Sequence, residues 1–225
     1  LRVVFGPFAA AEPQWLQIVL FLSVASMLLG ALAAIGQSNI KRLMAYSSIG
    51  HMGYALIGFA AGSQAGVQGV LIYLVIYMMT TIGTFVCILI MRRDGKAVEN
   101  IEDLAGLSDR DPTTAYLLAI MMFSLIGIPP LAGFFAKWYV FVAAIESGLY
   151  LLAVIGFITS VIGAYYYLRI IRVMFFDKPA APFEKPLGSV NSAVLAASSA
   201  FVIFFVVAPA PLVEAASTAA KSLFP

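Results

Sequence analysis

The sequence predicts an all-α, polytopic membrane helix bundle of about six transmembrane helices. Of its 225 residues, 62% are apolar and only 11% are charged, whereas ordinary soluble domains are roughly 25% charged. The mean hydropathy is +0.99. Apolar runs recur along the whole chain, and a helix of about 20 such residues crosses a hydrocarbon core of about 30 Å. Runs such as 18–35 and 194–207 are continuously apolar rather than alternating, which argues against a β-barrel.

The apolar runs divide the chain into an ordered series of elements. We expect six spans, at residues 15–36, 43–61, 67–91, 113–146, 149–173 and 190–213. Because the chain begins with Leu1 and shows no signal peptide, we expect it to be a fragment. The expected organisation is the end of a preceding helix and a loop over 1–14, a five-helix unit over 15–176, a cytoplasmic loop over 177–189, and a final transmembrane helix with a C-terminal tail over 190–225.

The basic residues collect on one side of the predicted spans. Ten of the thirteen follow the first, third or fifth span: Lys41, Arg42, Arg92, Arg93, Lys96, Arg110, Arg169, Arg172, Lys178 and Lys185. Only Arg2 and Lys221 fall on the other side. Because cytoplasmic loops carry an excess of lysine and arginine, the first side should be cytoplasmic and the C-terminus periplasmic. The net charge of +2 is too small to indicate a nucleic-acid partner.

The fourth span is too long for one straight crossing. A continuous helix over 113–146 would reach about 51 Å at 1.5 Å per residue. Its middle contains Gly127, Pro129, Pro130 and Gly133, and these prolines remove backbone donors while the glycines allow sharp bends. We therefore expect two half-helices. Discontinuous helices recur at transporter binding sites, although a simple proline kink is the alternative interpretation.

Lys137 is the basic residue that remains after the loops are assigned. It follows Pro130 by seven residues and precedes Glu146 by nine, which places it near the middle of the membrane. A charged group there costs about 2.5 to 3.5 kcal/mol on insertion scales, and such residues usually mark ion or proton paths. The alternative is a lysine that extends its amine to an interface, but no predicted loop lies within reach. We therefore predict that Lys137 transfers protons.

Polar side chains recur at helical spacing in the second and third spans. Ser47, His51 and Tyr54 share one face, and His51, the only histidine, lies about 15 Å into the membrane. The third span repeats the pattern with Tyr73, Tyr77, Thr80 and Thr84. An imidazole titrates near about pH 6.5 and suits proton exchange, but a lone histidine is equally a packing residue. Hydroxyls at this spacing either order water or hold helices together, so both interpretations stay open.

The sequence lacks the common signatures of cofactor binding. It contains no phosphate loop, no dinucleotide fingerprint, no histidine pair at metal spacing and no cysteine cluster. Its single cysteine, Cys87, lies inside an apolar run. We therefore expect no cofactor and no metal in this chain, and any activity would consist of moving ions across the membrane.

Three motifs carry a resemblance to one known family. Residues 36–54 (GQSNIKRLMAYSSIGHMGY), 127–141 (GIPPLAGFFAKWYVF) and 165–169 (YYYLR) resemble the antiporter-like membrane subunits of respiratory complex I, the proton-pumping NADH:quinone oxidoreductase. The resemblance covers essentially the whole chain. It implies two inverted five-helix repeats, each with a broken helix, of which this chain resembles the second repeat and the final helix.

The resemblance implies a proton-translocating subunit of the bacterial inner membrane, in contact with lipid, water, protons and the other membrane subunits of complex I. The family's lysine on the second broken helix falls on Lys137, whereas a glutamate and two lysines of the first repeat match nothing in this sequence. Lys41 and Arg42 match a recurrent pair that we interpret as interface charges. The resemblance implies that NADH, FMN, iron–sulfur clusters and quinone are held by other subunits.

Two other interpretations remain open at this point. One is a subunit of a multisubunit cation/proton antiporter or of a membrane-bound hydrogenase, within the same superfamily. The other is a structural membrane scaffold in which Lys137 only pairs with a fixed carboxylate. A hydrated cavity beside Lys137 favours transport, whereas a dry ion pair favours the scaffold.

The charge distribution generates a prediction about topology. In sealed right-side-out vesicles, a membrane-impermeant amine reagent should label Lys221 and leave Lys96 and Lys178 unlabelled, because the basic side should be cytoplasmic. Inverted vesicles are the control and should give the opposite pattern. Labelling of Lys96 and Lys221 from the same side would contradict the topology.

Overall fold

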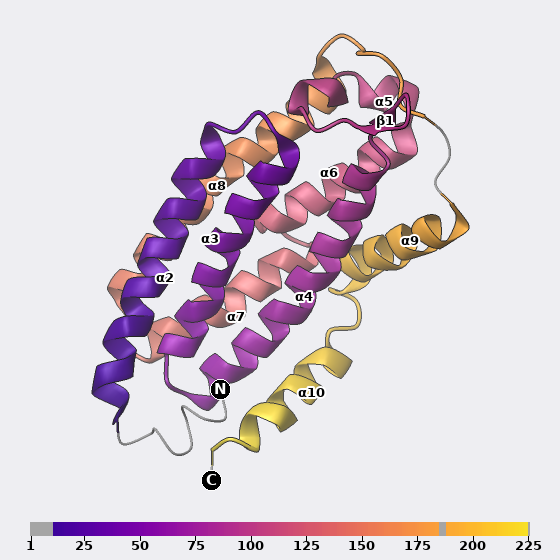
Figure 1. Ribbon diagram of the computed structural model, residues 1–225. Helices are drawn as coiled ribbons and strands as arrows, with labels where there is room; N and C mark the ends of the chain where they lie inside the picture. The colour runs from indigo at the N-terminus through magenta and orange to yellow at the C-terminus, as the bar shows by residue number, and fades with distance from the viewer. Residues whose placement is uncertain (1–10, 185–187, 225) are drawn as a thin grey trace.

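The computed structural model describes residues 11–184 and 188–224, which form a helical bundle (Figure 1). The expected helix end at residues 1–5 lies outside the described residues, as do Arg2, Lys185 and Pro186. Within the described residues, three helices are long and apolar enough to cross a membrane: Pro13–Ile35, Gln64–Leu89 and Tyr150–Phe176. The predicted all-α membrane bundle is therefore confirmed.

The first three helices follow the predicted spans closely and lie side by side (Figure 1). They are α2 (Glu12–Ile35), α3 (Ile40–Ala60) and α4 (Gln64–Leu89). Helices α2 and α3 pack backbone to backbone, because a Cβ atom on Gly30 would lie 2.5 Å from the amide nitrogen of Gly50. The hydroxyl of Ser23 also donates to the carbonyl of Gly53 at 2.8 Å. This close approach brings the polar face of α3 into the middle of the bundle.

The predicted break in the fourth span is present. The chain forms α6 (Pro112–Ile126) and α7 (Ala132–Glu146), joined by five residues without regular helix, and α8 (Tyr150–Phe176) follows after a short turn. Asp111 begins α6 by accepting from the amide of Thr114 at 3.2 Å, as expected of an aspartate at a helix N-cap. The half-helices lie against α4 on one side and α8 on the other.

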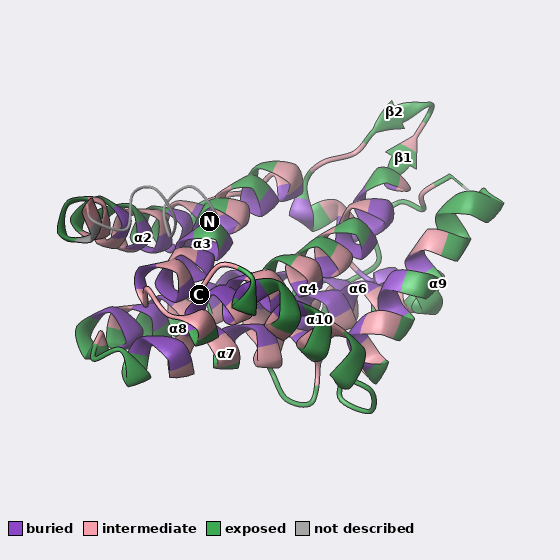
Figure 2. Ribbon diagram, turned by 90° about the horizontal axis from the view of Figure 1, so that it is seen from below, coloured by how far each residue is buried: buried purple, intermediate pink, exposed green. Residues whose placement is uncertain are grey.

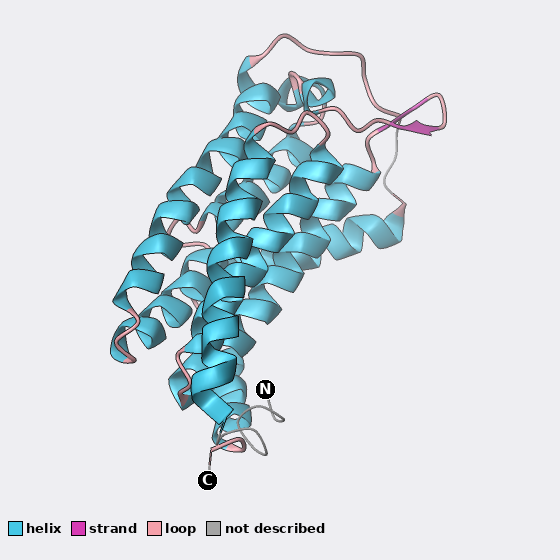
Figure 3. Ribbon diagram, turned by 60° about the vertical axis from the view of Figure 1, so that its left-hand side comes forward, coloured by secondary structure: helices cyan, strands magenta, loops and turns pink. Residues whose placement is uncertain are grey.

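The final span differs from the prediction of one helix over 190–213. The structure has α9 (Ser189–Phe204) and α10 (Ala210–Lys221), separated by a turn. Pro209 and Pro211 explain the division, because neither can donate the backbone hydrogen bond that a continuous helix would need. Because the apolar run continues to Val207, hydropathy does not indicate where α9 ends. Figure 3 shows the bundle from the side, with the strands beyond one end of the helices.

The segment between α4 and α6 has more structure than the expected charged loop. It contains β1 (Arg92–Arg93) paired antiparallel with β2 (Lys96–Ala97), a 3-10 helix η2 (Ile101–Leu104) and the short α5 (Leu107–Arg110). Asp94 and Gly95 form the hairpin turn with φ of 50° and 71°, the left-handed conformation that a two-residue Asp-Gly turn adopts. This hairpin signal was present in the sequence and was not recognised.

Polar links join this segment to the turn between α2 and α3. The carboxylate of Glu99 accepts from the Nζ of Lys41 at 2.8 Å and from the Nδ2 of Asn39 at 2.7 Å. The hydrogen bond from Lys41, followed by that from Asn39, lowers the pKa of the Glu99 carboxyl group. The link therefore contributes above the ordinary glutamate pKa of about 4.3 and is lost as the pH falls through the lowered pKa of Glu99. Its contribution is small, since the pair is partly exposed.

The α8–α9 connection folds back over the same end of the bundle. The ring of Phe183 lies below two guanidinium groups, with centroid distances of 5.1 Å from Arg93 and 5.4 Å from Arg110. Both arginines also donate to the carbonyl of Ala181. Figure 1 shows that the three connections on this side, α2–α3, α4–α6 and α8–α9, gather at one end of the bundle, while α10 ends at the other. The described basic residues of the three loops therefore share one end, as the charge pattern predicted.

The core consists of two apolar clusters stacked along the bundle, with polar residues between them. One cluster, around Met44, Met122 and Ile170, lies toward the basic end. The other, around Met27 and Val140, lies toward the opposite end. Figure 2 shows the buried residues facing inward between the helices and the exposed ones on the outer faces. The buried polar side chains of α3, α4 and α7 include Ser47, His51, Thr80 and Lys137.

The close α2–α3 contact generates a stability prediction. Gly30→Val should lower the free energy of unfolding by about 1–3 kcal/mol, because the added atoms meet the backbone of α3, which cannot yield as a side chain can. Gly36→Val is the matched control, since no atom lies within 4 Å of a Cβ built there. Thermal unfolding of the purified protein in detergent measures both effects. Equal unfolding temperatures for the two variants would contradict the predicted contact.

Candidate functional site

The site is built around the break between α6 and α7, where Lys137 crosses back to the end of α6. Its Nζ donates to the carbonyl of Ile126 at 2.8 Å and to the hydroxyl of Ser160, on α8, at 2.6 Å. The carbonyl of Ile126 is free to accept because α6 ends there and residue 130, four positions later, is a proline without an N–H. The break therefore supplies an acceptor for the lysine amine.

Two glycines allow this geometry. Gly127 has a φ of 92°, a conformation that L side chains rarely adopt, and a Cβ there would lie 3.1 Å from Cδ of Lys137. Gly133 sits in the first turn of α7, where a Cβ would overlap the carbonyl of Ser124 on α6. Its amide donates to the hydroxyl of Ser124 at 3.1 Å. Two of the predicted hinge residues, Gly127 and Gly133, thus allow the half-helices and the side chain of Lys137 to lie close together.

Lys137 has no carboxylate partner in the described part of the chain. Its side chain is buried, with 8% of the residue exposed, and the ion pairs among the described residues join Lys41 to Glu99 and Arg93 to Asp103. The Nζ instead lies 5.0 Å from the ring centroid of Tyr54. A lysine amine has three hydrogens to donate, and two of them have protein acceptors here. The arrangement differs from the dry ion pair of a structural scaffold.

His51 is held through both ring nitrogens. Its Nδ1 lies 2.6 Å from the hydroxyl of Tyr73, on α4, and its Nε2 lies 3.1 Å from the hydroxyl of Tyr167, on α8. The Tyr167 hydroxyl also bonds to that of Ser47. The ring of Tyr77 stacks on the imidazole at a centroid distance of 4.8 Å. His51 is therefore the centre of a hydrogen-bonded chain that runs from Ser47 to Tyr73.

The other polar residues predicted on the faces of α3 and α4 lie at different distances from the hydrogen-bonded chain that runs from Ser47 to Tyr73. Tyr54 donates to the hydroxyl of Thr159 at 3.3 Å, and Tyr77 donates to that of Ser48 at 2.7 Å. Thr80 and Thr84 donate to carbonyls one turn earlier in α4, those of Ile76 and Thr80. Thr80 lines the cavity described below, whereas Thr84 does not. The structure thus brings Ser47, His51, Tyr73 and Tyr77 together and leaves Thr84 apart.

Lys137 borders two spaces. The inner one is a small cavity of about 10 Å³, close to the least volume that holds one water molecule. It is lined by His51, Tyr73, Ile76, Tyr77, Thr80, Ser124, Leu125, Gly133, Ala136 and Lys137. The outer one is a groove of about 490 Å³ between α7 and α8, whose walls include Ser160, Trp138 and Phe157. The lysine therefore lies between the His51 chain and the outer face of the bundle.

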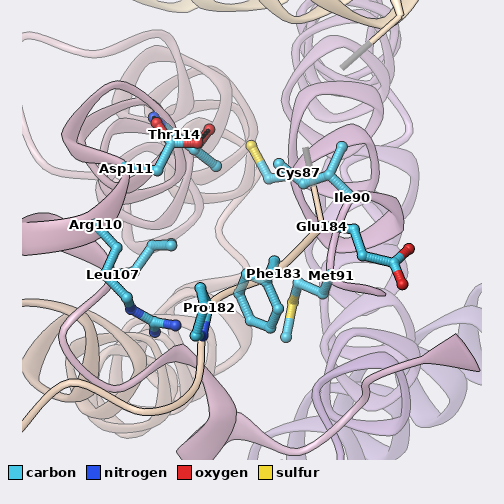
Figure 4. Close-up of a pocket in the computed structure, with 10 residues that line it drawn as sticks. All are labelled: Cys87, Ile90, Met91, Leu107, Arg110, Asp111, Thr114, Pro182, Phe183 and Glu184. Atoms are coloured by element: carbon cyan, nitrogen blue, oxygen red, sulfur yellow. Dashed lines mark hydrogen bonds between the residues drawn. The ribbon is translucent and has the colours of Figure 1, made fainter. Parts of the chain in front are cut away.

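A separate pocket of about 80 Å³ lies at the basic end. Figure 4 shows Cys87 of α4 and Met91, just after the end of α4, on one side, Asp111 and Thr114 on another, and the ring of Phe183 from the α8–α9 connection. None of its lining residues belongs to the Lys137 cavity. Among the described residues, no three histidine, cysteine, aspartate or glutamate side chains converge in a way that could hold a metal ion.

Sequence reasoning missed the contribution of α8 to the site. Ser160 and Tyr167 both bond to predicted site residues, and Thr159 bonds to Tyr54. The signal was present, because Gly156, Ser160, Gly163 and Tyr167 share one helical face. Small residues at such spacing are typical of close helix packing, and Gly156 does pack closely, with its Cβ position 2.7 Å from the side chain of Ile57. A face of small residues therefore also carries two polar partners.

Comparisons with known proteins agree with this architecture. The family model described as "NADH:quinone oxidoreductase/Mrp antiporter, TM" matches residues 1–163. Proteins named NADH-quinone oxidoreductase subunit N are 58% identical in Parvibaculum lavamentivorans and 62% identical in Azorhizobium caulinodans, over 100% of this chain and 47% of each relative. The chain thus spans less than half the length of these relatives.

Solved structures give the same fold. A chain of respiratory complex I from Thermus thermophilus is 29% identical, with a TM-score of 0.74 over 88% of this chain and 45% of that one. A chain of the Mrp complex from Dietzia sp. has a TM-score of 0.88 over 99% of this chain and 50% of that one, at 22% identity. The second likeness concerns the fold alone.

The contacts of Lys137 generate a second stability prediction. Ser160→Ala should lower the free energy of unfolding by about 1.5–3 kcal/mol, because it removes a hydrogen bond to a buried amine. The same change in a Lys137→Leu protein should have almost no effect. Ser147→Ala, which removes an exposed hydroxyl bonded to the carbonyl of Ala61, is the control and should cost less than about 0.5 kcal/mol. Equal costs of Ser160→Ala with and without Lys137 would contradict the predicted coupling.

Proposed function

Because the chain belongs to the NADH:quinone oxidoreductase/Mrp antiporter transmembrane family, we propose that it is part of subunit N of a bacterial NADH:quinone oxidoreductase. In this function it carries one section of a proton path through the inner membrane and holds no redox centre. The relatives of 58% and 62% identity that bear the name subunit N favour this member of the family. The sequence motifs at residues 36–54 and 127–141 favour it as well.

The observation that carries the proposal is the buried amine of Lys137 at the break. The amine lies where a helix leaves a carbonyl unpaired, beside a polar cavity, and without a carboxylate among the described residues. A lysine can exist with or without its extra proton, whereas a guanidinium stays charged in proteins. Lys137 is therefore suited to take up a proton from one side and release it to the other.

The neighbouring residues take distinct roles in this proposal. His51, with Tyr73, exchanges protons with Lys137 across the inner cavity, which has room for about one bridging water. Ser160 and the carbonyl of Ile126 hold the amine in place. Pro129 and Pro130 interrupt the helix at the break and so leave that carbonyl unpaired, while Gly127 and Gly133 let the half-helices and Lys137 approach closely.

The remaining parts of the assembly lie outside this chain in the proposal. NADH, FMN, iron–sulfur clusters and quinone bind to other subunits, and the partners of this chain are other membrane subunits, lipid, water and protons. The basic end of the bundle, with Lys41, Arg93 and Arg110, faces the cytoplasm, and α10 faces the periplasm. The five-helix unit at 15–176 is one antiporter-like repeat, and a further repeat in the longer relatives completes the path.

Lys137 provides the test of the proposal. In the complete complex, Lys137→Ala should abolish or strongly reduce proton transfer while the subunit content stays normal, because no other described lysine lines the cavity. Lys137→Arg should also be impaired, since arginine does not release its proton. The measurement is proton transport per quinone reduced in proteoliposomes.

Lys221→Ala is the matched control, because this lysine is exposed at the end of α10. Its proton ratio should equal that of the unmodified complex. A Lys137→Ala complex that assembles and keeps both its turnover and its proton ratio would show that Lys137 is structural, and the proposed function would then be wrong for this site.

A further inference from the structure

The imidazole of His51 is held by two tyrosine hydroxyls, one at each ring nitrogen. A neutral imidazole has one nitrogen that donates and one that accepts, and both nitrogens of His51 have hydroxyl partners. The ring also stacks on Tyr77, so it cannot turn over without losing two hydrogen bonds and a ring contact. The ring nitrogen that donates is therefore decided by which tyrosine hydroxyl donates to the imidazole and which one accepts from it.

The hydroxyl of Tyr73 is suited to donate to His51. It is buried, with 1% of the residue exposed, and His51 is its hydrogen-bond partner among the described residues. If Tyr73 accepted from Nδ1–H instead, its own hydrogen would point into the cavity without a protein acceptor. Donation from Tyr73 to Nδ1 leaves the ring proton on Nε2, where the oxygen of Tyr167 accepts it.

The hydroxyl of Tyr167 can accept from His51 because Ser47 lies on its other side. The hydroxyls of Tyr167 and Ser47 are hydrogen-bonded, and either can be the donor. When Tyr167 accepts from Nε2–H, its own hydrogen can therefore be donated to the oxygen of Ser47. The buried hydroxyl of Tyr166 also lies within hydrogen-bonding reach of Ser47 and Tyr167. Beyond these hydroxyls, toward the basic end, the next buried side chains are apolar, with Leu43, Met44 and Ile170 at 0% exposure. The chain of hydroxyls therefore ends in the buried group of Ser47, Tyr166 and Tyr167, and the apolar side chains beyond it do not continue it toward the basic end.

We propose that Tyr167, backed by Ser47, is the positioning residue that holds His51 with its proton on Nε2, so that His51 takes up and releases its second proton only at Nδ1. On uptake, a proton from the cavity binds to the oxygen of Tyr73, and the hydrogen of Tyr73 passes to Nδ1. Release reverses both transfers. The bonds from Nε2 to Tyr167 and from Tyr167 to Ser47 keep their direction in both states, so one proton enters and one leaves on the Lys137 side.

This inference rests on the proposed function and deepens it, because it assigns a direction to the exchange at His51. Helix α8 then contributes two positioning residues to the site. Ser160 holds the amine of Lys137, and Tyr167 holds the imidazole of His51, with the two residues on one face of the helix. One helix thereby fixes the two exchanging groups relative to each other.

Tyr167→Phe tests the inference, since it removes the hydroxyl and keeps the ring. In the complete complex in proteoliposomes, proton transfer should slow about tenfold, the scale expected for losing one buried hydrogen bond. In a His51→Leu complex, which itself transfers protons more slowly, Tyr167→Phe should cause no further slowing, because the two residues act as a unit. Tyr165→Phe, at an exposed tyrosine two positions away, is the control and should leave the rate unchanged.

A spectroscopic measurement separates positioning from a packing effect. The infrared band of His51, assigned by its loss in His51→Leu, should be that of the Nε2–H form in the unmodified complex and should change toward the Nδ1–H form in Tyr167→Phe. Ser47→Ala should produce the same change to a smaller extent, and it serves as the second variant if Tyr167→Phe does not assemble.

Three results would overturn the inference. They are normal proton transfer in Tyr167→Phe, equal slowing by Tyr167→Phe with and without His51, and an unchanged His51 band in Tyr167→Phe and Ser47→Ala. The proposed function fails separately, through normal transfer in Lys137→Ala. Blocked transfer in Lys137→Ala together with normal transfer in Tyr167→Phe would refute only the role of Tyr167.

Discussion

A buried amine needs hydrogen-bond acceptors, and the interior of a membrane bundle offers few, because each regular helix uses its own carbonyls. Lys137 obtains one from the end of α6, where the carbonyl of Ile126 has no partner further along the chain, and a second from Ser160 of α8. The break, the two glycines and the position of α8 all serve this requirement. If α6 and α7 formed one regular helix with a residue other than proline at position 130, the carbonyl of Ile126 would be used within it and the amine would lose this acceptor.

Much of the fold could be predicted because membrane burial leaves simple patterns in a sequence. Long apolar runs predicted the helices, and the excess of lysine and arginine predicted that three loops lie at the same end of the bundle. The division of the last span was harder, because hydrophobicity continues through Phe204 and Val207 while Pro209 and Pro211 stop the helix. The β-hairpin was missed although Asp94 and Gly95 are typical of such turns, since a charged loop was expected there.

The candidate site was only partly predictable, because helical spacing shows which residues share a face but not which helix that face meets. Lys137, His51 and Tyr73 were found from their own helices, and the structure places them around one cavity. Their partners on α8, Ser160 and Tyr167, depend on how α8 packs against α3 and α7. Thr84 shows the opposite error. It lies on the predicted face, but its hydroxyl bonds to its own helix and it does not line the cavity.

The hydrogen bond from Lys137 to Ile126 has a mechanical consequence, because its donor belongs to α7 and its acceptor to α6. At 2.8 Å it is close to the normal length, and a separation of the half-helices by about 1 Å would carry it beyond hydrogen-bonding range. The start of α6 is fixed by Asp111 and by the arginine contacts to the α8–α9 connection. A force that reaches α7 therefore acts directly on the amine, and the position of one half-helix determines whether the lysine still has its backbone acceptor.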